Sequence, residues 1–326
     1  MDFRLDEEQR ELQDTVRRFC ADRLPLERVA REGERPFDRT LWREMAELGL
    51  FSVLADGTDR AAGAGMVGAA IVFEQLGAHL VDGPVLWTCL AAPFVGKAAA
   101  GEYVVGGVDV ASGTAPWLVE HAGEIDALLI LRRDGVFVGS GADLPAFEPL
   151  AALDPLTPAG RCDALPTGTR VGDAGDAARL RLAGAVLCSA LQVGVSSAAL
   201  EASRRYALDR EQFDVPIGSF QAIQHMLADM YVRDALARSA SYAAAAAADD
   251  PESGDALRAS NAAKVVAGEA ALENARAAIQ IHGGIGFTWD ALPSHLLKRA
   301  WVLEYGFGDA DAHARAVGAA LVGRVA

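Results

Sequence analysis

The sequence contains little cysteine and no obvious metal-binding pattern. Only four of its 326 residues are cysteines, and no two of them form a CxxC pair. A zinc site or a disulfide framework is therefore not indicated. We expect reduced, buried thiols at Cys20, Cys89, Cys162 and Cys188.

Basic charge is also in short supply, with 30 Lys and Arg residues against 45 Asp and Glu, a formal net charge of −15. Binding to nucleic-acid phosphates needs clustered basic residues, so no nucleic-acid partner is expected. The same charge repels a CoA thioester at long range, so a CoA site would need local basic residues. The N-terminus lacks an apolar signal core, and we find no apolar run long enough to cross a bilayer uninterrupted. A cytoplasmic protein without membrane contact is the expectation.

Three regions with different residue patterns predict domains at residues 1–100, 101–176 and 177–326. The first region reads as helices. Asp6 and Gln9 resemble a capping box, and further helices are expected at 39–48 and 63–80. The middle region contains short strand-type runs separated by Gly, Pro and Asp, which predict a small β domain. Those runs are 103–105, 127–131 and 136–138.

The last third has helical periodicity and predicts a bundle of four helices. A poly-alanine run at 243–248 supports this reading, because alanine is the strongest helix former. The expected helices are 178–208, 221–248, 255–281 and 293–305. The sequence therefore predicts a mainly α protein with a small β domain between two helical ones.

One turn in this bundle, from Arg210 to Gln221, has features of an anion site. Pro216 and Gly218 must break the helical pattern there. Ser219 stands where an N-cap side chain would satisfy the first amides of the next helix. An arginine beside an open helix N-terminus favours a bound anion. On the physics alone, a plain helix–helix turn with a solvated arginine is the alternative.

A second distinctive segment runs from Gln280 to Trp289 (QIHGGIGFTW). Gly283 and Gly284 can stop the preceding helix and allow a ligand to approach the backbone closely. The segment does not follow a strand, so it does not predict a Rossmann dinucleotide site. A glycine C-cap without a ligand remains the structural alternative. His282 is expected to pack rather than to catalyse.

The order of these segments resembles the acyl-CoA dehydrogenase family. The match is carried by residues 206–213 (YALDREQF), 216–230 (PIGSFQAIQHMLADM) and the Gly-Gly segment, with weaker support from 1–9, 41–50 and 74–77. Asp214 stands where the family usually has glycine. The resemblance implies three domains, helical, β and helical, the last a four-helix bundle. It also implies contacts with an FAD bound mainly by a neighbouring subunit, made by Arg210, Phe213, Gln221, Gln280, Gly283 and Gly284.

Other features of the family are missing from this sequence. Its β domain normally carries Thr-Glu-Pro-x-x-Gly-Ser-Asp and a later Trp-Ile-Thr or Trp-Ile-Ser, which contact the flavin ring, and we find neither. The catalytic carboxylate falls at Phe307 by ungapped counting from Gly283, or at Gly184 by counting back from Tyr206. Neither residue can accept a proton. Glu304 and Asp309 lie nearby and are expected at a solvated helix end.

The resemblance therefore implies a companion subunit that serves a neighbour's flavin. It is similar to the short, non-catalytic subunits of heterotetrameric (α2β2) steroid side-chain dehydrogenases. A longer homologous subunit would supply the base and most of the FAD site. The substrate would be an acyl-CoA, with electron-transfer flavoprotein as acceptor. Two alternatives stay open: a self-sufficient homo-oligomeric dehydrogenase with Glu304 or Asp309 as base, and a flavin-free helical assembly module.

Overall fold

A computed structural model of the chain describes residues 5–32, 36–54, 64–111, 113–250, 252 and 254–322. Of the segments discussed above, residues 1–4 and Gly63 lie outside the described residues. The chain forms two compact units. One comprises Met1–Gly33, Ala70–Val81 and Ala185–Ala326, and the other comprises Glu34–Ala69 and Asp82–Gly184. Helices α4 and α7 each contribute residues to both units.

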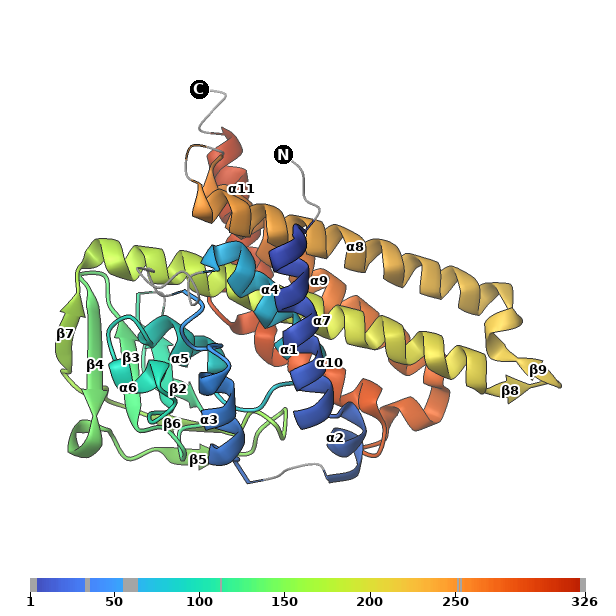
Figure 1. The fold of residues 1–326 in the computed structure, drawn as a ribbon, viewed down its shortest axis with the longest axis horizontal. Helices are drawn as coiled ribbons and strands as arrows, with labels where there is room; N and C mark the ends of the chain where they lie inside the picture. Colours follow the sequence, from blue (N-terminus) through green and yellow to red (C-terminus); the bar gives the residue numbers. More distant parts are fainter. Residues whose placement is uncertain are drawn as a thin grey trace. The chain divides into compact units, whose positions relative to one another are not determined.

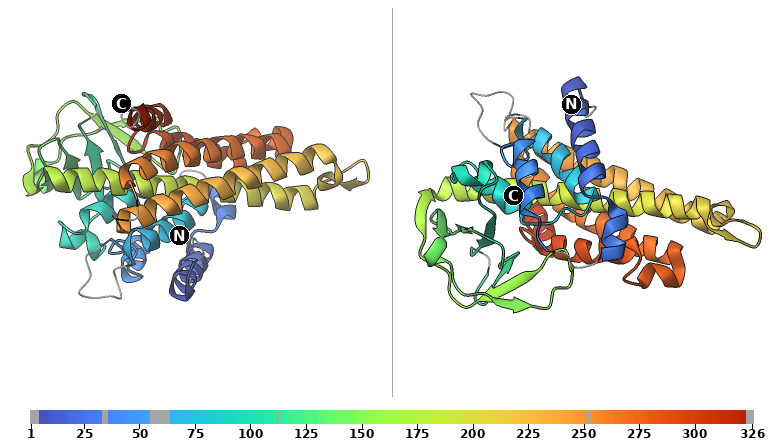
Figure 2. Two further views of the ribbon diagram at one scale, coloured as in Figure 1. Left: turned by 90° about the horizontal axis from the view of Figure 1, so that it is seen from above. Right: turned by 60° about the horizontal axis from the view of Figure 1, so that its bottom comes forward.

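The first unit is helical. It begins with α1, whose N-cap Asp6 forms the predicted capping box with Gln9. In its bundle α8 packs along α9, side by side in both figures (Figures 1 and 2). The predicted bundle helices are confirmed, and α11 is an additional helix that the sequence patterns did not indicate. The elements are α1 (Glu7–Arg23), α2 (Leu26–Glu32), α4 (Gly65–Ala78), α7 (Ala174–Asp209), α8 (Gln221–Asp249), α9 (Ala256–His282), η4 (Gly283–Phe287), α10 (Leu292–Tyr305) and α11 (Ala310–Val322).

The second unit contains three short helices, α3 (Arg39–Glu47), α5 (Val85–Ala91) and α6 (Gly96–Ala99), and two sheets. The larger sheet has the order β1-β3-β4-β7, with β1 parallel and β4 antiparallel to the fully buried central strand β3. The smaller sheet has the order β2-β6-β5. The strands are β1 (Val105–Asp109), β2 (Trp117–Glu120), β3 (Ala127–Leu131), β4 (Val136–Ser140), β5 (Glu148–Leu150), β6 (Ala159–Cys162) and β7 (Thr169–Gly172).

The strands run from Val105 to Gly172, inside the region predicted to be β. The exact domain boundaries at residues 100 and 176 stay a prediction. All four cysteines are free and buried, as expected. Burial raises the pKa of Cys20 and of Cys89 to about 12, which keeps both thiols protonated and unreactive.

The turn after α7 is a β-hairpin rather than a simple break. Strand β8 (Glu211–Gln212) pairs with β9 (Val215–Pro216), and the hairpin protrudes beyond the ends of α7 and α8 (Figure 1). Its two loop residues, Phe213 and Asp214, have φ of 56° and 65°. A two-residue hairpin loop requires this left-handed backbone, which glycine adopts most easily and aspartate tolerates. The left-handed backbone thus explains why position 214 can be glycine in the family and aspartate in this chain.

The predicted N-cap role of Ser219 is wrong. A short 3-10 turn, η2 (Ile217–Ser219), delays the start of α8 by one residue, so Phe220 becomes the N-cap and supplies no side-chain hydrogen bond. The Ser219 hydroxyl instead donates to the carbonyl of Pro216 at 2.7 Å. The first amides of α8 are therefore left without a side-chain acceptor.

Helices α4 and α7 touch backbone to backbone at two glycines. A Cβ on Gly77 would lie 2.2 Å from the carbonyl oxygen of Leu191, and one on Gly194 would lie 2.1 Å from that of Glu74. Real Cβ atoms do not approach backbone oxygens so closely. Only glycine on both helices permits this crossing, which brings Glu74 of α4 against the bundle.

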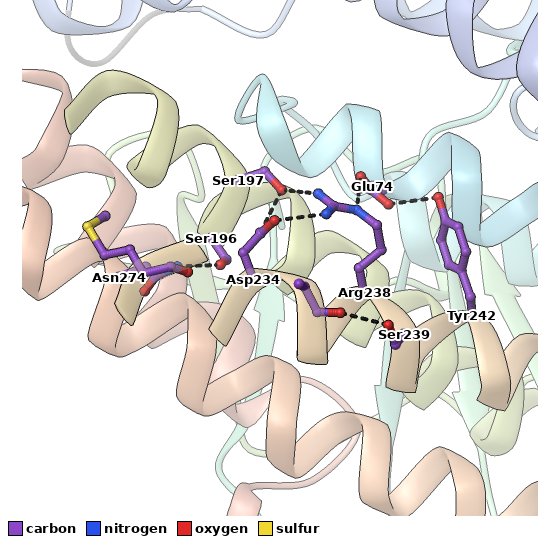
Figure 3. Close-up of polar contacts among 10 residues, drawn as sticks. Glu74, Ser196, Ser197, Asp234, Arg238, Ser239, Tyr242 and Asn274 are labelled. Atoms are coloured by element: carbon purple, nitrogen blue, oxygen red, sulfur yellow. Dashed lines mark hydrogen bonds and ion pairs between the residues drawn. The ribbon is translucent and has the colours of Figure 1, made fainter. Parts of the chain in front are cut away.

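A buried ionic network holds this crossing in place (Figure 3). Arg238 of α8 donates from Nε to Glu74 Oε1 at 3.0 Å and pairs through Nη1 with Asp234 Oδ2 at 2.9 Å. Ser197 of α7 accepts from Arg238 Nη2 and donates to Asp234, while Tyr242 donates to Glu74 Oε2 at 2.8 Å. Two carboxylates that are 94% or more buried thus share one guanidinium. The network joins α4, α7 and α8.

Helix α7 corrects one sequence-based expectation. It contains an 18-residue window of mean hydropathy 1.6, so it is long and apolar enough to cross a membrane by composition alone. The expectation that no run reaches that length is therefore wrong. In the structure 89% of this window is buried inside the protein, which explains the apolar character of the helix.

We expect Gly194→Ala to destabilise the chain by about 3 kcal/mol or more, because the added methyl group has no space beside the α4 backbone. Gly318→Ala is the matched control. Gly318 lies exposed in α11, and a Cβ there meets nothing within 4 Å. The control should leave stability unchanged or raise it by up to about 1 kcal/mol. Urea denaturation of the full chain measures both, and equal stability of the two variants would contradict the crossing.

Replacing Arg238 by Met should cost about 3 kcal/mol, because Glu74 and Asp234 would be left buried without a counter-charge. The control is Arg204→Met. This substitution removes an exposed ion pair between Arg204 and Glu201, which both lie on α7. Exposed pairs contribute about 1 kcal/mol or less. The same denaturation measurement applies, and a cost below that of the control would show that the network is not stabilising.

Candidate functional site

Arg210, the first predicted anion ligand, directly follows α7 and has a fixed backbone. Its N–H donates to the carbonyl of Tyr206, and its own carbonyl accepts from Ile217 N, both at 2.8 Å. Its side chain is exposed and has no hydrogen-bond or ion-pair partner among the residues that the structure describes. The guanidinium is therefore available to a ligand from outside the chain.

The N-terminus of α8 is similarly open. The backbone amides of Gln221 and Ala222 have no acceptor within the described part of the chain, and the Gln221 side chain is exposed. Free amides at a helix N-terminus bind anions. Phe213, 87% exposed at the hairpin tip, packs edge-on against Phe220 with ring centroids 6.2 Å apart. The hairpin and the helix start thus present donors and an aromatic surface together.

The second predicted segment begins where α9 ends. Gly283 has φ of 65° and ends the helix, as predicted. A Cβ on Gly283 or Gly284 would meet no atom within 4 Å, so the backbone lies open on this side. The side chain of Gln280 is exposed one turn earlier. These residues leave room for a ligand to lie against the main chain.

A ring stack brings the two segments to the same end of the bundle. Tyr206, one turn before Arg210, lies against His282, next to Gly283, with centroids 4.1 Å apart and planes at 21°. His282 Nδ1 donates to the carbonyl of Ala278 at 2.7 Å. Burial lowers the pKa of His282, which keeps the ring neutral. His282 therefore packs, as expected, and its partner Tyr206 is a residue whose role the sequence did not reveal.

The two positions predicted for the base contain no proton acceptor. Phe307 lies in the turn after α10 with φ of 57°, and its carbonyl accepts from His313 Nε2 at 3.0 Å. The alternative position, Gly184, has no side chain. Both predicted base positions are thus occupied by residues that cannot catalyse proton abstraction.

The two neighbouring carboxylates cap the next helix. Asp309 Oδ1 accepts from Ala312 N at 2.7 Å, and Glu304 Oε1 accepts from Ala310 N at 2.9 Å. These bonds satisfy the first amides of α11. Glu304 is less solvated than expected, because its Oε2 is buried and has no hydrogen-bond partner among the described residues. A Cβ on Gly268 would lie 2.5 Å from this Oε2, so Glu304 occupies the space that this glycine leaves.

Lys264 fixes the end of α10 and is a second residue that the sequence patterns missed. Its side chain is only 1% exposed, and Nζ donates to the carbonyls of Leu303 and Glu304 at 3.0 and 3.3 Å. A cation at a helix C-terminus is stabilised by the free carbonyls there. In sequence it is a lone lysine within an alanine-rich helix, so only the three-dimensional contact reveals its role.

The start of β2 partly matches the Trp-Ile-Thr pattern that is missing from the β domain. Residues 117–119 read Trp-Leu-Val, which has the tryptophan of the Trp-Ile-Thr pattern but valine in place of the hydroxyl residue. Val119 is completely buried and packs into the domain. Its side chain offers no hydrogen-bond donor, so the side-chain hydroxyl of the family pattern is absent at this position.

Taken together, the predicted FAD contacts fit part of that cofactor. An unpaired guanidinium and two free helix amides suit a pyrophosphate, and an open glycine backbone suits the adenosine side. The residues that would hold these parts are Arg210, Phe213, Gln221, Gln280, Gly283 and Gly284. The described residues contain no group of three or more His, Cys, Asp or Glu side chains placed to hold a metal.

Comparison with known proteins gives a consistent result. Residues 6–97 match the model "Acyl-CoA dehydrogenase, N-terminal domain", and residues 179–322 match "Acyl-CoA dehydrogenase, C-terminal domain". The chain is 32% identical to acyl-CoA dehydrogenase IpdE2 of Mycobacterium tuberculosis, over 90% of this chain and 91% of that protein.

Two solved structures extend the comparison. The ChsE4–ChsE5 complex of Mycobacterium tuberculosis has a chain that superposes with a TM-score of 0.85 at 26% identity, over 99% of both chains. Glutaryl-CoA dehydrogenase of Mycobacterium smegmatis superposes with a TM-score of 0.81 at 22% identity, over 98% of this chain and 95% of that one, which shows a shared fold.

Acidification should destabilise the chain as pH falls below about 6.5, the unperturbed value for histidine. Burial is the main cause that lowers the pKa of His79, His282 and His313. The unfolded chain therefore binds more protons than the folded chain below that pH, and unfolding is favoured. Melting temperatures measured between pH 7.5 and 5.5 give the slope of stability against pH. His282→Asn, which keeps a donor to Ala278, should flatten it, and an unchanged slope would contradict this assignment.

Proposed function

Because the chain belongs to the acyl-CoA dehydrogenase family, we propose that it is the companion subunit of an FAD-dependent enzyme. The complex oxidises an acyl-CoA to its trans-2-enoyl-CoA. The observation that carries this proposal is an asymmetry. The residues predicted to contact a neighbour's FAD are open to a ligand, whereas Phe307 and Gly184 occupy the two positions predicted for a base. A homologous partner subunit supplies that carboxylate.

The division of chemistry follows from this asymmetry. A carboxylate on the partner removes the α-proton, which the thioester carbonyl acidifies. When bound, FAD supplies the hydride acceptor. The residues of this chain hold and orient rather than react: Arg210 and the α8 N-terminus neutralise phosphate charge, and Gly283 with Gly284 let the adenosine side lie against the backbone.

Dependence on a partner is supported by the solved ChsE4–ChsE5 complex, in which a chain of the same fold is found in a complex of two named components. We propose an α2β2 assembly on that basis. A steroid side-chain acyl-CoA is the proposed substrate, because residues 283–290 (GGIGFTWD) resemble that branch of the family. Electron-transfer flavoprotein as acceptor and a cytoplasmic location complete the proposal.

A self-sufficient dehydrogenase is the second candidate, favoured by one observation. Glu304 has a buried carboxylate oxygen without a hydrogen-bond partner among the described residues, and a carboxylate can act as a general base. This candidate predicts acyl-CoA turnover by the chain alone, lost in Glu304→Gln. The companion-subunit proposal predicts no turnover by the chain alone. It also predicts that Glu304→Gln leaves the turnover of the complex nearly unchanged.

We expect Arg210→Gln to weaken FAD binding by the assembled complex about tenfold or more, because a charge-assisted hydrogen bond contributes about 1.5–3 kcal/mol. Arg204→Gln is the control, since Arg204 is exposed in the last turns of α7, shortly before Arg210, and pairs with Glu201. FAD dissociation constants come from fluorescence titration of the complex stripped of flavin. Equal constants for the two variants would remove Arg210 from the FAD site.

A further inference from the structure

A cavity of about 690 Å³ lies in the second unit, where strands β5 and β6 form part of its wall. The rest of the wall comes from the chain just before α3, the connection between α4 and α5, the turn after β2 and the loop between β5 and β6. A concave, mostly apolar site of about 300–1,000 Å³ with a few polar groups is the usual form of a small-molecule site. The size and the lining of this cavity therefore suit a small ligand.

The apolar walls of the cavity are held in place by their own contacts. The apolar lining includes Phe37, Phe147, Leu150 and four prolines. The ring of Phe37 packs against that of Trp42, with 5.3 Å between the centroids. In the loop between β5 and β6, Asp154 is completely buried and accepts from the hydroxyl of Thr157 at 2.9 Å. A ligand would therefore meet walls that are already ordered, which lowers the entropic cost of binding.

His121 lines the same cavity in a strained backbone conformation. Its φ of 52° lies in the left-handed region, which bulky residues rarely adopt. Two backbone hydrogen bonds hold it there, from His121 N to the carbonyl of Pro158 at 2.6 Å and from Glu124 N to the carbonyl of His121 at 2.8 Å. The residue is only 2% exposed, and its Nδ1 lies 3.8 Å from Asp82 Oδ1. Strain of this kind is concentrated at ligand-binding and active sites, so it singles out this cavity.

The carboxylates of the lining are not fully balanced by positive charge. Asp82 and Glu124 line the cavity, and its lining residues include no lysine or arginine. His121 can balance at most one of the two carboxylates. Arg39 contacts Glu124 only at the main-chain carbonyl, at 2.7 Å, and its guanidinium pairs with Asp126 at 2.8 Å. The Glu124 carboxylate itself has no ion-pair or hydrogen-bond partner among the residues that the structure describes. At least one negative charge therefore remains unmatched.

We propose that this cavity binds an organic cation, an apolar ring or chain that carries a primary ammonium group. The apolar body lies against the phenyl and proline walls and gains from the burial of apolar surface. The ammonium group donates to the Glu124 carboxylate, and such a charge-assisted hydrogen bond is stronger than a neutral one. An anion is repelled by the same carboxylate. A metal ion is not the ligand, because the described residues hold no cluster arranged to bind one.

This proposal does not depend on the flavin function, since the second unit alone forms the cavity. Three ligands with the same naphthalene ring test it: 1-naphthylmethylamine, 1-naphthylmethanol and 1-naphthoate, which are cationic, neutral and anionic at neutral pH. Calorimetric titration of the full chain measures their dissociation constants. We expect the amine to bind at least about tenfold more tightly than the alcohol, and the carboxylate to bind most weakly. No saturable binding of the amine, or an amine that binds no more tightly than the alcohol, would overturn the proposal.

A charge variant with a matched control tests the role of Glu124. Glu124→Gln keeps the shape of the side chain, and it should weaken binding of the amine at least about tenfold while leaving the alcohol unchanged. Asp143→Asn removes an exposed carboxylate of the same unit that does not line the cavity, and it should change neither ligand. Unchanged amine affinity in Glu124→Gln would contradict the site. Equal losses in both variants would also contradict it, because they would show a general attraction of cations to an acidic protein.

A second pair of variants tests the apolar wall. Phe147→Ala removes one phenyl ring and should weaken binding of both the amine and the alcohol. Leu153→Ala is the control, because Leu153 is 54% exposed and does not line the cavity. Equal affinities for these two variants would place the binding elsewhere. If Phe147→Ala fails to fold, the comparison of Glu124→Gln with Asp143→Asn decides alone.

Discussion

The contact between α4 and α7 is the constraint on which the helical unit depends. Two glycines, Gly77 and Gly194, let the backbones touch, and this closeness brings Glu74 to Arg238. The guanidinium then satisfies two buried carboxylates that would otherwise be costly to bury. Helix α7 is thereby fixed, and with it the hairpin and Arg210 that follow its end.

Much of the fold was predictable because glycine and proline mark the ends of long helices. The predicted helix at 221–248 is α8 (Gln221–Asp249), and Gly283 ends α9 as expected. The hairpin at Phe213–Asp214 was not predicted, because two-residue strands have no periodicity to read. Strands β2, β5, β6 and β7 were missed for the same reason: they have three or four residues each, and sheet pairing rather than local pattern defines them.

Part of the candidate site could likewise be predicted from the sequence, and part could not. Candidate ligand-contacting residues at its surface could be proposed from the sequence, because residue type and order carry that information. The contacts that position them could not. Tyr206 meets His282, and Lys264 meets the end of α10, across separations of 76 and 39 residues, which no local pattern encodes. The capping role of Glu304 likewise appears only once α11 is known. The absence of a proton acceptor at the predicted base position, Phe307, can by contrast be read from the sequence alone.

The central claim is that this chain completes a flavin site held mainly by a partner subunit. The most direct measurement is the visible absorption spectrum of the purified chain, compared with that of the chain co-purified with a homologous catalytic subunit. We expect flavin absorption only in the complex, at about one flavin per pair of unlike subunits. Full flavin occupancy in the chain alone would contradict it, and so would a well-formed complex that contains no flavin.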